Sequence, residues 1–314
     1  MRFLNLLFLC LVPFSVAAVE YPSTGVEMKV HQVSEHVYYV SGPPGIATSN
    51  AGFISSAGFV ITDEGVVLFD SLGTPSLGFQ LLGKIRELTD QPIRRAYISH
   101  YHADHVYGAQ VFEDAGAEII APDGASRYLE SEVSSQRLEE RRISLDPWVN
   151  EGTRLVYPDR YVKGEESFSL GGVDFRAVNV GSAHSDGDLI LFVESDRVLF
   201  SGDIIFEGRI PFFGSTNSRQ WLEILSQLAE TDVNAIVPGH GLAARDPVAL
   251  VSLTRNYLAY MRKVMAEAVE NWVPFDEAYE AADWDDFIDF PAFFEANRRN
   301  AYSVYLSIEQ EALE

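Results

Sequence analysis

Cysteine is nearly absent from this sequence, since Cys10 is the only one in 314 residues. It lies in an apolar stretch, Phe3 to Phe14, that precedes small residues at positions 16–18. This order is typical of an export signal, so we expect residues 1–18 to form a signal peptide that is cleaved near Ala18, and the protein to be periplasmic or secreted. The mature chain would then have no disulfide and no thiolate, and a metal could be bound only by His, Asp, Glu or backbone groups.

Basic residues and long apolar runs are also scarce. The chain has 23 Lys and Arg against 46 Asp and Glu, a formal net charge of −23. This balance argues against a nucleic-acid partner, because binding to phosphates needs a surplus of basic residues. After the leader, no stretch approaches the roughly 20 apolar residues of a transmembrane helix, so we expect no membrane insertion of the mature chain. The hydrophobic content of 47% predicts a well-packed globular protein, and it leaves the oligomeric state open.

Short strands and helices follow one another in two rounds along the chain. The first round predicts strands at residues 37–40, 51–55, 59–62, 66–69, 95–99 and 118–121, and helices at 77–88 and 106–115. The second predicts strands at 167–170, 173–180, 188–193, 197–200 and 235–237, and a helix at 218–228. Between the rounds, we expect a helix at 126–142 and an irregular segment at 146–159. Whether residues 126–159 close over a site is left open.

This pattern predicts an α/β protein in which two sheets pack face to face with helices outside them, because each sheet must bury both of its faces. From Asp246 onward helical spacing dominates, with breaks at Pro274 and Pro291. We therefore expect one main domain at residues 19–245, followed by a helical C-terminal extension, residues 246–314, that packs on the core.

Three imidazoles and a carboxylate occur within six residues, His100-Tyr101-His102-Ala103-Asp104-His105, directly after a predicted strand. Residues two apart project to the same side of an extended chain, so His100 and His102 are placed to bind one metal ion. Asp104 and His105 turn toward a neighbouring position. Imidazole nitrogen and carboxylate oxygen are ligands that zinc prefers, and the spacing therefore indicates two metal positions.

Three more candidate ligands lie in turns that follow predicted strands, where site residues often occur. They are His184 in Gly181–Asp188, Asp203 in Ser201-Gly202-Asp203, and His240 in Pro238-Gly239-His240-Gly241. The two remaining histidines, His31 and His36, have no ligand-like neighbours, and we expect them to be ordinary surface or core residues.

Taken in order, five motifs resemble those of the metallo-β-lactamase-fold metallo-hydrolase superfamily over roughly residues 30–245. These are Asp70 at a strand end, H-x-H-x-D-H at residues 100–105, and then His184, Asp203 and His240. The resemblance implies a four-layer αβ/βα sandwich of two mixed β-sheets. It also implies that His100, His102 and His184 bind a first zinc ion, that Asp104, His105 and His240 bind a second, and that Asp203 bridges them. Asp70 would fix the orientation of the ligand loop without binding a metal ion itself.

The same resemblance implies an exported binuclear zinc hydrolase acting on a small molecule. A metal-bound hydroxide, oriented by Asp104, would attack an ester, lactone, lactam or thioester. Two alternatives stay open: an iron-dependent enzyme of the persulfide dioxygenase type, with the same fold, and a true β-lactamase. Against the second, Asp203 stands where β-lactamases with a cysteine ligand have Cys.

At other positions too, this sequence differs from members of the superfamily that act on particular substrates. Phe206 stands where quorum-signal lactonases usually have Tyr. Thioesterases of the glyoxalase II type use basic residues near the C-terminus, but Arg298-Arg299 are more typical of a solvated helix face. The leader, the stretch 202–211 and the Pro-Gly-His-Gly turn look most like periplasmic hydrolases grouped with sulfur-oxidation and quinoprotein-relay systems. Tyr101 and Arg209 are candidate substrate contacts, because a cation near the metals could hold a substrate carboxylate.

Overall fold

The computed structural model describes residues 21–214 and 216–313. The expected signal peptide, residues 1–18, lies outside the described residues. Among the helices of the described part, none combines the length and apolar character needed to cross a membrane.

Seven strands form the first sheet, in the order β1-β2-β3-β4-β5-β6-β7. They are β1 His31–Gln32, β2 Val37–Ser41, β3 Ser56–Thr62, β4 Gly65–Phe69, β5 Ile93–Tyr97, β6 Glu118–Pro122 and β7 Arg160–Val162. Strands β1 to β4 make an antiparallel meander, whereas β4 to β7 pair in parallel. The parallel half is where helical crossovers carry the chain between strands, so that several loops lie at one end of the sheet.

Five strands form the second sheet, in the order β12-β11-β10-β9-β8. They are β8 Glu165–Leu170, β9 Val173–Gly181, β10 Asp188–Val193, β11 Val198–Phe200 and β12 Ala235–Val237. Only β11 and β12 pair in parallel, so this sheet is mixed as well.

Alternation along the strands fixes how the layers stack. In β4, Val67 and Phe69 pack between the sheets with residues of the second sheet such as Phe175. Val66 and Leu68, on the opposite face of β4, pack against the helices that cover the first sheet. The alternation gives the predicted four layers, helix, sheet, sheet and helix.

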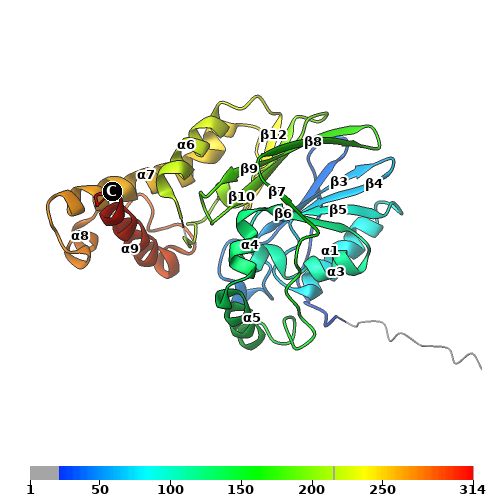
Figure 1. Cartoon of the computed structure of the whole chain (residues 1–314), viewed down its shortest axis with the longest axis horizontal. Coiled ribbons are helices and arrows are strands. Elements are labelled where there is room, and N and C mark those ends of the chain that lie inside the picture. The colour runs from blue at the N-terminus through cyan, green and yellow to red at the C-terminus, as the bar shows by residue number, and fades with distance from the viewer. Residues whose placement is uncertain (1–20, 215, 314) are drawn as a thin grey trace, which may run out of the picture.

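Helices cover both outer faces of the sandwich (Figure 1). On the first sheet lie α1 Pro75–Arg86, α2 Ala103–Val106, α3 Ala109–Asp114, α4 Gly124–Leu129 and α5 Glu132–Ser144, together with the short η1 Ala47–Ser49. On the second lie α6 Ser218–Ala229 and α7 Pro247–Glu270, and η2 Gly202–Ile204 follows β11. Helices α8 Phe275–Ala281 and α9 Phe293–Glu311 pack against α7 and extend to the left of the sandwich in Figure 1. The predicted α/β sandwich and the helical C-terminal region are both confirmed.

The C-terminal helices support a segment of the core. Helix α7 packs against α6 and α9. From α9, the buried Asn300 donates from Nδ2 to the carbonyl of Pro211 at 2.7 Å and accepts from the backbone N–H of Phe213 at 2.9 Å. These two bonds fix the stretch 211–213, which borders the site described below.

Three local predictions were wrong in detail. Residues 51–55 form a turn instead of a strand, because Ala51 and Gly52 have positive φ, and the strand begins at Ser56. The helix expected at 126–142 is two helices, since Ser131 has an extended backbone between α4 and α5. The helix expected at 106–115 is likewise divided into α2 and α3.

We predict that Gly58→Ala destabilises the fold. Gly58 in β3 faces Phe200 of the second sheet, and a Cβ at this position would lie 2.0 Å from the ring. Overpacking of this kind costs about 1–3 kcal/mol of unfolding free energy, measurable by urea denaturation. The control is Gly83→Ala in α1, where nothing lies within 4 Å of the added Cβ and helix propensity favours alanine by about 0.5–1 kcal/mol. Unchanged stability of Gly58→Ala would contradict this close approach of the sheets.

Candidate metal centre

Seven polar side chains from four segments of the chain converge at one end of the sandwich, and they form two groups. One group is His100, His102, His184 and Asp203, and the other is Asp104, His105 and His240. Within each group the potential ligand atoms lie within 4.8 Å of one another. The structure therefore brings together all seven residues that the sequence singled out, and it separates His100 and His102 from Asp104 and His105, as their spacing indicated.

The ends of strands place these side chains. His100 and His102 follow β5, and Asp104 and His105 lie on the short helix α2. His184 lies in the connection from β9 to β10, Asp203 in η2 after β11, and His240 after β12. The lack of a side chain at Gly239 leaves room for the Asp203 carboxylate, because a Cβ at residue 239 would lie 2.1 Å from Asp203 Oδ1.

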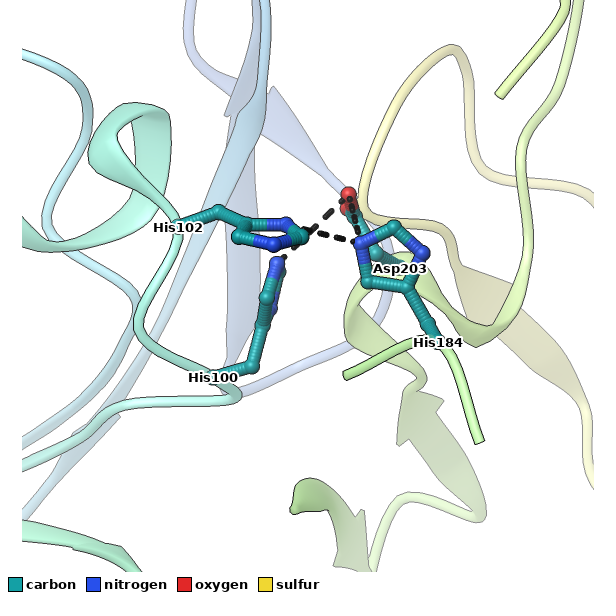
Figure 2. Close-up of side chains that lie close together, drawn as sticks. All are labelled: His100, His102, His184 and Asp203. Carbon is teal, nitrogen blue, oxygen red and sulfur yellow. Dashed lines mark hydrogen bonds and ion pairs between the residues drawn. The ribbon is translucent and has the colours of Figure 1, made fainter. Parts of the chain in front are cut away.

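In the first group, three imidazoles point toward one carboxylate (Figure 2). His184 Nε2 lies 2.9 Å from His102 Nδ1 and 3.3 Å from Asp203 Oδ2. His100 Nε2 lies 3.7 Å from the same carboxylate oxygen. Nitrogen atoms from three directions thus surround one small volume next to Asp203.

The second group shares Asp203 with the first. Asp203 Oδ1 lies 3.1 Å from His105 Nε2, and Asp203 Oδ2 lies 3.4 Å from His240 Nε2. Asp104 Oδ2 lies 3.3 Å from the same His240 nitrogen. Asp203 is therefore within reach of both groups, which is the position that a bridging ligand requires.

Several of these ligand atoms form no hydrogen bond with the protein, although oppositely charged groups lie near them. Among the described residues, His100 Nε2, His105 Nε2 and Asp203 Oδ1 are buried without a hydrogen-bond partner. Leaving such groups unsatisfied costs about 1–3 kcal/mol each, and more for charged ones. A metal ion bound by nitrogen and carboxylate oxygen removes this cost, and the donor set matches zinc. The residues present therefore fit a pair of metal ions.

Charge at the centre favours cation binding. Burial lowers the pKa of His184 to about 3, so its imidazole is neutral. Burial opposes ionisation of Asp203, but the imidazoles of His105, His240 and His100 outweigh it and hold the Asp203 pKa well below its ordinary value. Burial also opposes protonation of His105, yet Asp203, Asp70 and Asp104 raise the His105 pKa well above its ordinary value. A metal ion must displace that proton in order to bind.

Asp70 supports the ligand loop through three hydrogen bonds. Its Oδ2 accepts from His105 Nδ1 at 2.8 Å and from Ser99 Oγ at 2.8 Å, and its Oδ1 accepts from the Ser99 backbone at 2.7 Å. The left-handed backbone of Asp70, with φ 64°, turns the carboxylate toward this loop directly after β4. Because Nδ1 of His105 is engaged, its Nε2 is the nitrogen directed at the centre.

Aromatic rings hold two of the other imidazoles. Phe206 stacks on His240 with centroids 4.8 Å apart and planes 9° apart, while His240 Nδ1 donates to the Ile54 carbonyl at 2.7 Å. Trp221 meets His184 edge-on at 5.2 Å. Trp221 was not identified from the sequence, although its place on the apolar face of a predicted helix was a usable signal.

A cavity of about 580 Å³ opens above the centre. One wall carries Tyr101, Tyr128, Val133, Arg137 and Arg141, and the other carries Phe206, Arg209, Phe212, Phe213, Glu295 and Arg299. His102, Asp104, Asp203 and His240 border the same space. The volume suits a small molecule.

Both predicted substrate contacts border this cavity. Arg209 is 1% exposed, and Tyr101 directs its hydroxyl away to the Val156 carbonyl at 2.9 Å, so only its ring borders the space. The irregular segment 146–159 contributes no lining residue.

Other lining residues were missed. Val133, Arg137 and Arg141 recur at intervals of four on α5, which is a signal for one helix face. Arg298 is exposed and pairs with Asp276, as expected of a solvated face, but Arg299 borders the cavity. The two histidines expected to be ordinary lie elsewhere, His36 paired with Asp196 and His31 stacked on Tyr39.

The fold and the site define an αβ/βα sandwich with a His/Asp centre suited to metal. Residues 50–240 match the metallo-beta-lactamase superfamily, and this chain belongs to that family. A linear primary-alkylsulfatase from Pseudomonas sp. is 20% identical over an alignment of 252 positions, which covers 69% of this chain and 48% of that protein. Metallo-beta-lactamase IND-1 from Chryseobacterium indologenes is 19% identical over 210 residues, 65% of this chain and 77% of that protein.

A solved structure shows the same fold. That of the stereoselective inverting sec-alkylsulfatase Pisa1 from Pseudomonas sp. has a TM-score of 0.69 at 15% identity, covering 89% of this chain and 50% of that one. This chain thus spans about half the length of the alkylsulfatases that it resembles.

We predict that Asp70→Asn weakens metal binding. The amide cannot carry the charge that stabilises His105, and loss of such a supporting partner typically costs 10–100-fold in metal affinity. Titration against a chromophoric chelator measures the loss, which should fall mainly on one of two metal equivalents. Asp196→Asn is the matched control, since it breaks the His36 pair far from the centre. Equal affinities in the two variants would show that Asp70 does not support the ligand.

Proposed function

We propose that this chain is an exported binuclear zinc hydrolase that cleaves an ester, lactone, lactam or thioester in a small molecule. The observation that carries the proposal is the position of Asp203 between two groups of imidazoles that border one cavity. In the proposed assignment His100, His102 and His184 hold the first ion, Asp104, His105 and His240 hold the second, and Asp203 contacts both. The ions would activate water at neutral pH and polarise the bond under attack.

Asp104 is the residue that we assign to orienting the attacking water. Its side chain is 20% exposed, whereas that of Asp203 is 4% exposed, and it borders the cavity. Burial opposes ionisation of Asp104, but His105 and His240 outweigh it and keep the Asp104 pKa far below its ordinary value. The carboxylate therefore accepts a hydrogen bond from water near the bond to be cleaved.

Apolar side chains around the centre exclude bulk water. Phe206 and Phe213 are buried, and Ile54 and Phe212 complete the apolar part of the lining beside His240. Electrostatic interactions are stronger in such surroundings than in water, so the charged side chains act on a bound substrate with little screening.

Sulfate-ester hydrolysis is a second candidate. It is favoured by the likeness to alkylsulfatases, which extends over most of this chain instead of only its family-defining part. The bond cleaved would then be one of the two ester bonds of an alkyl sulfate, C–O or O–S, and the same ligand set would serve.

We expect the zinc-loaded mature chain to turn over at least one member of a substrate panel. The panel holds β-lactams, acyl-homoserine lactones, glutathione thioesters, simple esters and alkyl sulfates, with product release measured before and after chelation and on return of zinc. Turnover of a β-lactam, lactone, thioester or simple ester that chelation abolishes supports the proposal, and turnover of alkyl sulfates alone supports the second candidate. A single iron in protein purified without added metal, with oxygen consumption on a persulfide, would contradict it in favour of a dioxygenase.

We predict that His184→Ala and His240→Ala each lose about one equivalent of zinc, because each removes a ligand from a different ion. Asp203→Asn should lower occupancy of both. Metal content after dialysis measures these losses, and His36→Ala, remote from the centre, should keep two equivalents. Full zinc content in the first two variants would mean that a ligand is misassigned.

A further inference from the structure

Arg209 is a buried cation with almost no partners. It is 1% exposed, and among the described residues its Nη2 has no hydrogen-bond partner. Its Nε reaches the Ile210 carbonyl only at 3.4 Å. Its Nη1 lies 3.4 Å from His240 Nδ1, but that nitrogen donates to the Ile54 carbonyl and cannot also accept. Nearly all five N–H groups of the guanidinium thus lack an acceptor.

An isolated buried charge is costly unless an opposite charge meets it. Within the described part of the chain, no carboxylate lies within 4.0 Å of the Arg209 guanidinium. The acidic groups whose charges act on the guanidinium are Asp104, Asp203 and Glu295. The first two are taken up by the metal centre in the proposed assignment, and Glu295 is exposed on α9. Arg209 therefore borders the cavity without a carboxylate to neutralise its charge, and a bound anion would supply that charge.

The rest of the cavity is basic too, in a chain whose net charge is −23. Arg137, Arg141 and Arg299 join Arg209 in the lining, and apart from the proposed ligands only Asp186 and Glu295 are acidic there. Arg141 and Arg299 form no ion pair with the described residues, and only Arg137 is paired, with Glu140. Such a local surplus of arginine draws anions toward the centre.

Apolar side chains lie next to the guanidinium. The Arg209 group stands 5.3 Å from the centroid of the Phe212 ring, and Phe213 follows in the stretch that Asn300 fixes. Tyr128 and Val133 form apolar surface on the opposite wall. The cavity thus combines a fixed cation with apolar surface.

We propose that the cavity takes an amphiphilic anion, in which a carboxylate or sulfate-type oxyanion is bound by Arg209 and an apolar portion lies between the two walls. Because Nη1 is 3.4 Å from the His240 ring, the oxyanion lies at or beside the bond to be cleaved. The reaction assigned to this ligand rests on the proposed hydrolase function, whereas its binding does not.

The test is calorimetric binding of three probes to the zinc-loaded protein: hexanoate, hexane-1-sulfonate and 1-hexanol. We expect at least one anion to bind tenfold or more tightly than the alcohol. Arg209→Met, which keeps the volume and removes the charge, should abolish this preference while leaving hexanol affinity and zinc content unchanged. Arg209→Lys should restore part of it. Arg298→Gln, on the outer side of α9, is the control and should bind like the wild type.

The outcomes separate this inference from the proposed function. Equal binding of anions and alcohol, or an anion preference that survives Arg209→Met, would overturn the inference even if the substrate panel shows zinc-dependent turnover. An Arg209-dependent preference would support it even if no carbonyl bond is cleaved. The tighter of the two anions identifies which oxyanion the site accepts.

Discussion

The carboxylate of Asp203 is the group on which the arrangement of the centre depends. It comes from the second sheet, yet it lies 3.1 Å from His105, which follows a strand of the first. Its place beside Gly239 leaves no room for a larger residue there. Backbone bonds between the sheets, from Leu189 to the Ser99 carbonyl at 2.8 Å and from Ser56 to the Gly239 carbonyl at 2.7 Å, keep the loops in register. The centre therefore exists only when both sheets are packed.

The ligands could be predicted from the sequence because each follows a strand. Alternating apolar residues indicated where β5 and β11 end, so that His100 and Asp203 fell in the loops beyond them. The division between two metal positions followed from spacing alone within residues 100–105. Which ion each candidate ligand from the second sheet would bind could not be derived that way, and that assignment came from the family resemblance.

What the sequence could not predict depends on contacts between distant segments. The orientation of Arg209 follows from its position beside His240 and Phe212, and the facing of α5 and α9 across one cavity joins residues more than 150 positions apart. The wrongly predicted strand at residues 51–55 has a cause in the backbone conformation of those residues. Residues 51–55 are as apolar as a strand, but the positive φ of Ala51 and Gly52 is a property of the backbone that composition does not reveal.

The candidate metal ligands and part of the cavity wall lie on different elements of the fold. The candidate ligands stand on loops and short helices after the ends of strands, whereas Val133, Arg137, Arg141, Glu295 and Arg299 of the cavity wall stand on α5 and α9, outside both sheets. Substitutions on these helices can therefore change what fits without moving a ligand. The candidate metal ligands and the cavity wall can therefore change independently of each other, which suits a superfamily that includes an alkylsulfatase and a β-lactamase. This separation makes the two helices the natural target for redesign of specificity.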